Sequence, residues 1–317
     1  MGIEYQQKKS NNFAAITCFF NFGKSELRET AYSRFSEGLK RQGVELFTIE
    51  LIYGENKPFI KPNSNCIHMR AGSVLWSKEN ILNILVKKLP KRIEKIAWVD
   101  GDILFSNDDW AKETSDKLNK KKILHLCDTI ERTDKHGEVL EYRMSIVKGL
   151  LRNHKSFLGP QLDPWADLGG KNGYHPGMAW AANRSFFEEV GLFEYDIAGG
   201  GDTTMFLCFI TGKAQSVGPS ASGLYRDGHH RSWHGKLRSY NRIAFDHVGR
   251  NVGYVRGDIT HIWHGDGKKK LYGPRHKLCS DVDFDADLKK DEQGLLVWAR
   301  GGAHEEKFKK LMIESGQ

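Results

Sequence analysis

The stretch Phe13-Ala14-Ala15-Ile16-Thr17-Cys18-Phe19-Phe20 is nearly all apolar, and it decides the fold class. A short apolar run of this kind is typical of a strand that is buried on both faces. Four apolar residues then recur at every fourth position: Leu27, Ala31, Phe35 and Leu39. This spacing predicts a helix over residues 25–42, and the next apolar run predicts a strand over residues 44–52. A strand, a helix and a strand with short links indicate parallel strands in a doubly wound α/β sheet.

Further elements follow the same alternation. The patterns predict helices over residues 78–89, 186–192, 202–210 and 305–313, and strands over residues 96–99 and 123–126. Residues 128–172 are polar, rich in Gly and Lys, and show no clear pattern. We expect a loose N-terminus over residues 1–11, one domain over residues 12–278, and a charged C-terminal extension with a helix over residues 279–317.

The composition is that of an ordinary globular protein. The chain has 317 residues, of which 39% are apolar and 28% charged, and its net charge is +8. These values exclude a disordered, collagenous or membrane-embedded chain. The start lacks the order of a secretory signal, so we expect a cytoplasmic protein from a bacterium or a virus-infected cell. The five cysteines have no paired spacing, which predicts free, mostly buried thiols.

Asp100-Gly101-Asp102 stands directly after the predicted strand Ile96–Val99. Glycine lets the chain turn sharply, so that both carboxylates can point at one spot, and hard divalent cations bind such oxygens together with phosphate oxygens. The alternative is a plain Asp-Gly turn.

A pair of histidines, His261 and His264, precedes the basic run Lys268-Lys269-Lys270. Imidazole and carboxylate together suit an ion such as Mn²⁺, and the lysines suit a bound diphosphate. Two ordinary surface or core histidines are the alternative. The spacing excludes the helical zinc-protease motif, which needs a pair at i, i+4 with an intervening Glu.

The third candidate segment is Gly199-Gly200-Gly201-Asp202. Glycines permit close approach of a ligand to the backbone, and an acid at the start of a helix is favoured by the helix dipole. An ordinary N-cap after a flexible loop is the alternative. The absence of a P-loop and of a Gly-rich fingerprint after the first strand disfavours kinases, P-loop ATPases and Rossmann dehydrogenases.

Taken in order, these segments resemble the GT-A glycosyltransferases, in particular the β-1,4-galactosyltransferase-like branch. Trp98–Asp102 matches the D-x-D metal site of that family, and His175–Trp180 resembles its donor-side segment. Gly199–Asp202 is similar to the end of the G-G-E-D motif, and His261–His264 is similar to M-x-x-H. Lys78 stands where the family has a basic residue on the donor diphosphate. The resemblance spans roughly residues 13–275.

The resemblance implies a GT-A fold with a doubly wound mixed sheet in a single domain, and a metal-dependent hexosyltransferase that uses a nucleotide-diphosphate sugar. It implies metal ligands of Mn²⁺ or Mg²⁺ at Asp100, Asp102, His261 and His264. It further implies donor-binding residues at Lys78, Asp100, Gly177 and Lys268. Asp202 would be the base that takes the proton of the acceptor hydroxyl in an inverting displacement. Two family residues are missing: a Glu is Gly201 here, and an acceptor-stacking Trp is Ala198.

The acceptor is predicted from residues 224–256, where seven basic residues and several aromatic ones are interleaved. Such a mixture suits a phosphate backbone with stacked bases, which points to a hydroxymethylated DNA base as the acceptor. The residues expected to contact DNA are Arg231, Lys236, Arg238 and Arg242. A solvated helix face explains the same pattern. A transferase for lipopolysaccharide or capsule glycan is the alternative enzyme, and a non-catalytic nucleic-acid or glycan binding module is the alternative of another class.

Overall fold

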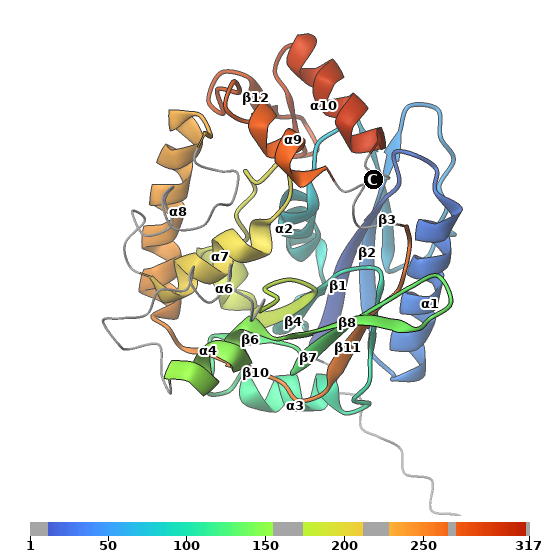
Figure 1. Cartoon of the computed structure of the whole chain (residues 1–317), viewed down its shortest axis with the longest axis vertical. Helices are drawn as coiled ribbons and strands as arrows, with labels where there is room; N and C mark the ends of the chain where they lie inside the picture. Colours follow the sequence, from blue (N-terminus) through green and yellow to red (C-terminus); the bar gives the residue numbers. More distant parts are fainter. Residues whose placement is uncertain (1–11, 155–173, 212–227, 266–270, 315–317) are drawn as a thin grey trace, which may run out of the picture.

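The computed structural model describes residues 12–154, 174–211, 228–265 and 271–314 (Figure 1). The strands are β1 (Phe13–Phe20), β2 (Leu46–Tyr53), β3 (Cys66–Ala71), β4 (Lys95–Val99), β5 (Ile103–Phe105), β6 (Ile123–His125), β7 (Thr129–Thr133), β8 (Val139–Met144), β9 (Ala179–Asn183), β10 (Val252–Tyr254), β11 (Asp258–His261), β12 (Leu288–Lys290) and β13 (Leu296–Trp298). The helices are α1 (Glu26–Arg41), α2 (Lys78–Lys88), α3 (Trp110–Lys117), α4 (Ile146–His154), α6 (Arg184–Glu189), α7 (Gly201–Ile210), α8 (Arg231–Val248), α9 (Tyr272–Leu278) and α10 (Ala303–Glu314).

A seven-stranded mixed sheet is the centre of this α/β fold, with the order β10-β6-β9-β4-β1-β2-β3. β9 pairs antiparallel with both of its neighbours, and the other pairs are parallel. The parallel pairing of β1 with β2 and β4 confirms the prediction from the strand, helix, strand order. A smaller sheet of order β5-β11-β7-β8 lies beside it.

β1 is buried on both faces, which is why its sequence does not alternate. Ala14 and Ile16 pack in a core with α2 and α7, whereas Phe13 and Ala15 pack in a second core with α1 and Trp110. The helix α1 covers that second face, but only part of the predicted stripe is inside, because Leu27 in its first turn is 43% exposed.

Residues 128–154, which showed no clear sequence pattern, form β7, β8 and α4. β8 is mostly exposed, with Leu140 69% and Tyr142 66% exposed, so the core did not impose an apolar pattern on it. This explains why hydrophobic periodicity gave no prediction there.

The C-terminal segment packs against the same core as α2. Asn80 on α2 donates to the carbonyl of Gly294 at 3.1 Å and accepts from the amide of Leu296 at 2.9 Å. Phe308 on α10 has no exposed surface. The predicted boundary at residue 278 stays a prediction.

None of the described helices is long and apolar enough to cross a membrane. All five cysteines are free thiols, and three of them are buried, as predicted.

Candidate functional site

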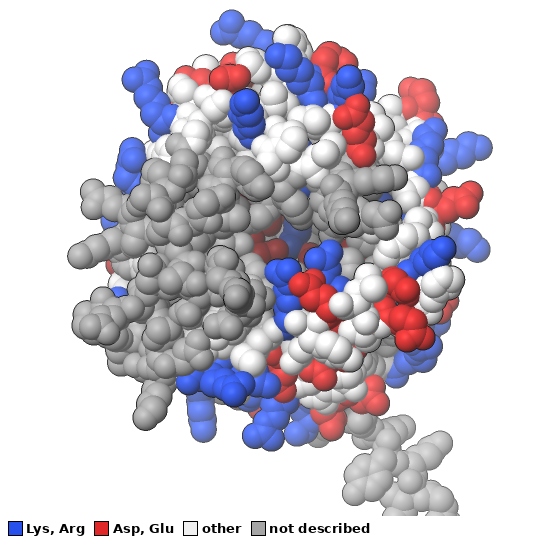
Figure 2. All heavy atoms as spheres, viewed as in Figure 1, with Lys and Arg blue, Asp and Glu red and all other residues white. Residues whose placement is uncertain are grey.

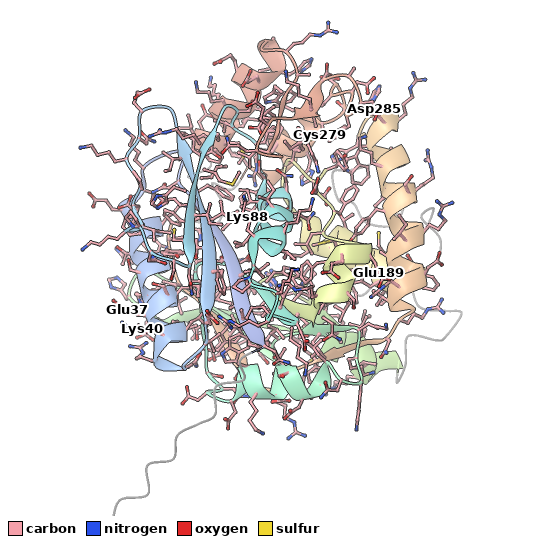
Figure 3. All side chains as sticks on the ribbon, turned by 180° about the vertical axis from the view of Figure 1, so that it is seen from behind. Glu37, Lys40, Lys88, Glu189, Cys279 and Asp285 are labelled. Carbon is pink, nitrogen blue, oxygen red and sulfur yellow. The ribbon has the colours of Figure 1, made fainter. Side chains whose placement is uncertain are left out.

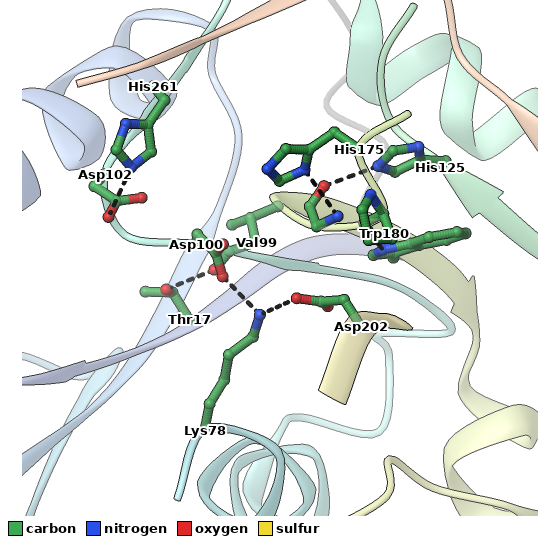
Figure 4. Close-up of polar contacts among 12 residues, drawn as sticks. Thr17, Lys78, Val99, Asp100, Asp102, His125, His175, Trp180, Asp202 and His261 are labelled. Atoms are coloured by element: carbon green, nitrogen blue, oxygen red, sulfur yellow. Dashed lines mark hydrogen bonds and ion pairs between the residues drawn. The ribbon is translucent and has the colours of Figure 1, made fainter. Parts of the chain in front are cut away.

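The acid pair lies at the carboxyl end of β4, in the middle of the large sheet. The Asp100 amide donates to the carbonyl of Met178 at 2.8 Å, which ties the turn to the strand β9 region. A Cβ at Gly101 would lie 3.3 Å from the Tyr32 ring and 3.6 Å from Thr17 Oγ1. Glycine is therefore suited to this turn by its small size. The two carboxylates do not point at one spot, as the sequence predicted, but in different directions, because Asp100 pairs with Lys78 and Asp102 with the histidines (Figure 4).

Lys78, the first residue of α2, connects two of the predicted acids. Its Nζ lies 2.7 Å from Asp100 Oδ1 and 3.0 Å from Asp202 Oδ2, and the residue is only 7% exposed. Burial lowers the pKa of Lys78, but the attraction of the two carboxylates outweighs burial and holds this pKa well above its ordinary value. Burial also raises the pKa of Asp100 to about 6, against the opposing effect of Lys78. A fixed cation thus stands between two acids that come from distant parts of the chain.

Asp202 is the second residue of α7, and the glycines before it set its position. Gly199 and Gly200 have φ values of +92° and +88°, which residues with a side chain rarely adopt. While Oδ2 of Asp202 accepts from Lys78, its Oδ1 is buried and has no hydrogen-bond partner among the described residues. One carboxylate oxygen is therefore available to accept a proton.

The other acid, Asp102, faces the two predicted histidines. His264 Nε2 lies 3.0 Å from Asp102 Oδ2, and His261 Nε2 lies 3.7 Å from it. The Ile262 amide donates to the Asp102 carbonyl at 2.8 Å and so fixes the end of β11 next to the turn. The structure therefore brings Asp102 together with histidines that are 159 and 162 positions away in the sequence, and Figure 4 shows His261 beside Asp102.

These three side chains fit a divalent cation. One ligand atom from each of Asp102, His261 and His264 lies within 4.8 Å of the others. Metal–ligand bonds of roughly 2.0–2.2 Å need such a separation, and a set of one oxygen and two nitrogens suits a transition-metal ion such as Mn²⁺. Asp100 is not in this group, since it pairs with Lys78. The sequence analysis expected Asp100 both as a metal ligand and as a residue that binds the sugar-nucleotide donor.

A second trio of side chains also has the spacing of metal ligands: Glu50, Cys66 and His68. Its role is structural. The Glu50 carboxylate accepts from the amides of Phe59 at 2.6 Å and Ile60 at 2.9 Å. His68 Nε2 lies 2.9 Å from the Ile60 carbonyl. These contacts anchor the loop after β2, and we assign no metal to this trio.

Sequence reasoning missed Glu79, which follows Lys78 in α2. Its side chain is 2% exposed, and a Cβ at Gly201 would lie 2.7 Å from its Cδ. Gly201 therefore makes room for the Glu79 carboxyl group beside Asp202. Burial raises the pKa of Glu79 to about 8; Lys78 opposes this shift, and Asp202 and Asp196 add to it. An acid directly next to the predicted Lys78 was the signal that could have pointed to Glu79.

Sequence reasoning also missed two histidines beside Gly177. His175 lies within the quoted donor-side segment, and its Nδ1 accepts from the Gly177 amide at 3.1 Å. His125, at the end of β6, has no exposed surface, and its Nε2 lies 2.9 Å from the Gly177 carbonyl. Gly177 itself lies in the site, because a Cβ there would be 3.4 Å from Asp202 Oδ2. Lys268 lies outside the described residues.

The four basic residues predicted to contact DNA all lie on α8. Arg231, Arg238 and Arg242 are exposed. Lys236 instead pairs with Asp285 at 2.6 Å and lies 4.6 Å from the centroid of the Tyr195 ring. Figure 3 shows Asp285 close to one end of α8.

The aromatic residues of α8 do not form the predicted stacking surface. Trp233 has no exposed surface, and its ring packs 5.9 Å from that of Phe193. Tyr240 donates to the Gly191 carbonyl at 3.0 Å, with its ring 5.2 Å from Phe193. Trp233 is therefore not available for stacking on a base. Both rings anchor an amphipathic helix to the core, and Arg231, Arg238 and Arg242 lie on its exposed face.

Figure 2 shows a hollow near the centre of the visible face, with acidic and basic atoms inside it and both kinds of charge scattered around it.

Comparisons with known proteins give only distant similarities. No family model and no curated protein matches the chain. Among solved structures, a mutant of Drosophila β1,4-galactosyltransferase 7 in complex with manganese, UDP-Gal and xylobiose is 13% identical, with a TM-score of 0.37. This match covers 91% of this chain and 95% of that one. A 4-diphosphocytidyl-2C-methyl-D-erythritol synthase from Anaerococcus prevotii is also 13% identical, with a TM-score of 0.37, over 83% of this chain and 95% of that one. A putative glucose-1-phosphate thymidylyltransferase from Bacillus anthracis is 11% identical, with a TM-score of 0.37, over 89% of this chain and 98% of that one.

Proposed function

We propose that this chain is a metal-dependent inverting glycosyltransferase that transfers a sugar from a nucleotide-diphosphate sugar to an acceptor hydroxyl. One observation carries the proposal: two clusters meet at the end of β4, Asp102 with His261 and His264 on one side, and Lys78 with Asp202 on the other. The first can hold a cation, and the second supplies a fixed positive charge and a carboxylate.

The first cluster has the composition that a diphosphate leaving group requires. A Mn²⁺ or Mg²⁺ ion held by Asp102, His261 and His264 would supply Lewis-acid neutralisation of the departing diphosphate. Lys78 adds a cation that stays protonated, because the carboxylates beside it keep its pKa high. Asp100 holds Lys78 in position through its contact at 2.7 Å.

Asp202 supplies the base of the reaction. A hydroxyl is a weak nucleophile at neutral pH unless a neighbouring group accepts its proton. The free Oδ1 of Asp202 accepts that proton while the hydroxyl oxygen bonds to the anomeric carbon and the bond from that carbon to the diphosphate breaks. A single displacement of this kind inverts the anomeric configuration.

Two acceptor classes, a hydroxymethylated DNA base and a lipid-linked glycan, follow from the sequence. Mass spectrometry of both after incubation with the enzyme and sugar nucleotides distinguishes them. Trp233 is buried and the half-buried Tyr240 packs on the core, so neither supports stacking on DNA bases, and we propose an acceptor hydroxyl without an acceptor class.

The test of the function combines turnover with direct metal binding. We expect release of a nucleoside diphosphate from a panel of UDP-, GDP- and dTDP-hexoses in the presence of Mn²⁺, and no release in EDTA. Titration with Mn²⁺ followed by EPR should show one bound ion in the wild type and none in Asp102→Ala. Asp116→Ala is the matched control, because Asp116 is 67% exposed and pairs with the exposed Lys112 at 3.5 Å.

Two results would overturn the proposal. Release of pyrophosphate from a nucleoside triphosphate and a sugar phosphate would identify a nucleotidyltransferase. Full turnover in EDTA, or Mn²⁺ binding that Asp102→Ala leaves intact, would remove the metal assignment.

A further inference from the structure

A chain of four hydrogen-bonded groups runs from the core to the candidate site. Ser145 Oγ lies 2.7 Å from His125 Nδ1, and His125 Nε2 lies 2.9 Å from the Gly177 carbonyl. The Gly177 amide then donates to His175 Nδ1 at 3.1 Å. His125 also stacks on Trp180 with the ring centroids 4.3 Å apart, which fixes the plane of its imidazole.

These contacts determine where each proton lies. A carbonyl oxygen can only accept, so His125 Nε2 carries a proton and its Nδ1 accepts from the Ser145 hydroxyl. His175 Nδ1 accepts from an amide, so the proton of the neutral ring is on Nε2. Burial keeps both rings neutral, since it lowers the pKa of His125 to about 4 and that of His175 well below its ordinary value.

The donor atom of His175 faces the site. In Figure 4 the nitrogen of His175 that is not bonded to Gly177 points to the side of the site on which Asp102 and His261 lie. A Cβ at Gly177 would be 3.1 Å from His175 Cε1 and 3.4 Å from Asp202 Oδ2, which places His175 and the proposed base beside the same backbone atom.

We propose that the Nε2–H group of His175 donates a hydrogen bond to a hydroxyl of the transferred sugar, and that Ser145, His125 and Gly177 position it. This inference rests on the proposed function, in which the diphosphate lies at Asp102 and the acceptor hydroxyl at Asp202. The transferred sugar must lie between those two groups. The His175 ring lies next to Asp202, across Gly177, and its other nitrogen points to the side of the proposed metal ligands. A single directed donor recognises an oxygen at one position of the sugar.

Binding measurements separate the sugar from the nucleotide. With Mn²⁺ present, His175→Ala should weaken binding of the nucleotide-diphosphate hexose that the wild type prefers by about 3- to 10-fold, the range for one neutral hydrogen bond. Binding of the same nucleoside diphosphate without sugar should stay within about twofold, because the proposed contact is absent there. His175→Gln keeps an N–H donor and should lose less, and His136→Ala, on the exposed turn after β7, is the control.

Deoxy-sugar nucleotides identify the hydroxyl. Removal of the recognised hydroxyl should weaken binding to the wild type and should have no effect in His175→Ala. If His175→Ala weakened binding of the nucleoside diphosphate and of the sugar nucleotide equally, or changed neither, the proposed role of His175 would be overturned. The proposed function would not be affected by that result. Failure of the wild type to bind any nucleotide-diphosphate hexose of the panel with Mn²⁺ would overturn the proposed function together with this inference.

Discussion

Lys78 is the residue on which the charge balance of the acid cluster depends. Its ammonium group contacts Asp100 and Asp202, and the buried Glu79 follows it in the chain. Three carboxyl groups therefore share the field of one cation in a region with little solvent. Burial is the main reason that the pKa of Glu79 rises to about 8, and the nearby carboxylates of Asp202 and Asp196 add to this rise.

Asp202→Asn tests the base directly. The amide keeps the shape of the side chain but cannot accept the hydroxyl proton, so transfer should fall by about 10² to 10⁴ while the affinity for the donor stays within a few fold. Single-turnover transfer and donor titration measure the two quantities separately, with the exposed Asp246→Asn as control. Retention of anomeric configuration in the product, or loss of donor binding with intact transfer, would contradict the base role.

Glu79→Gln tests the raised pKa through stability. Because the folded pKa of about 8 lies above the ordinary value of 4.5, the folded state holds a proton that the unfolded state has released between these two values. The stabilisation from this proton is present at low pH and is lost as the pH rises towards 8. The variant lacks this titration, so its Tm should rise relative to that of the wild type as the pH increases over that window. Parallel Tm curves for the two proteins would show that Glu79 keeps an ordinary pKa.

At the scale of elements, the site depends on how closely α2 and α7 approach. Gly201 at the start of α7 has no side chain, and the Glu79 carboxyl group of α2 fills the space beside it. This packing puts Lys78 and Asp202 within hydrogen-bond distance, although they are 124 positions apart. The contact between the two helices thus brings the cation to the base.

Gly201→Ala should separate these helices. The added methyl group would lie 2.7 Å from Glu79 Cδ, so either the carboxyl group or the helix has to move. We expect a loss of about 1–3 kcal/mol of unfolding free energy from overpacking, together with a large loss of transfer. Gly302→Ala is the matched control, because nothing lies within 4 Å of its Cβ. Glu79→Ala in the Gly201→Ala background should restore part of the stability, and failure to do so would place the strain elsewhere.

At the scale of the whole molecule, the C-terminal segment belongs to the core that supports α2. Phe308 and Met312 on α10 have no exposed surface, and they belong to the same apolar cluster as Ile81 and Ile84 of α2. The ring of Trp298 lies 5.9 Å from that of Phe308. Substitutions that disturb the packing of α10 should therefore also disturb α2, the helix that carries Lys78.

Phe308→Ala should destabilise the entire protein. Loss of a fully buried ring costs about 3–5 kcal/mol, whereas Ile313→Ala, on the same helix but 45% exposed, should cost about 0.5 kcal/mol or less. Denaturant unfolding followed by tryptophan fluorescence and by far-UV circular dichroism should give one coincident transition that shifts in Phe308→Ala. An unshifted main transition would mean that residues 279–317 fold as an independent extension.

The sequence alone determined the α/β class, the parallel pairing around β1 and most of the helices, because burial on two faces and helical spacing leave periodic apolar patterns in the chain. It also pointed to the turn after β4, the histidine pair and Asp202, since glycine and acid signals at strand and helix ends are local. It predicted neither β7 and β8, which are half exposed and so carry no apolar pattern, nor the inward packing of Trp233.

Only the tertiary structure decided that Lys78 joins Asp100 to Asp202, that Glu79 fills the space at Gly201, and that His125 and His175 hold Gly177 between them. These contacts join side chains from different elements, and their distances depend on how helices and strands pack, which no local pattern in the sequence records.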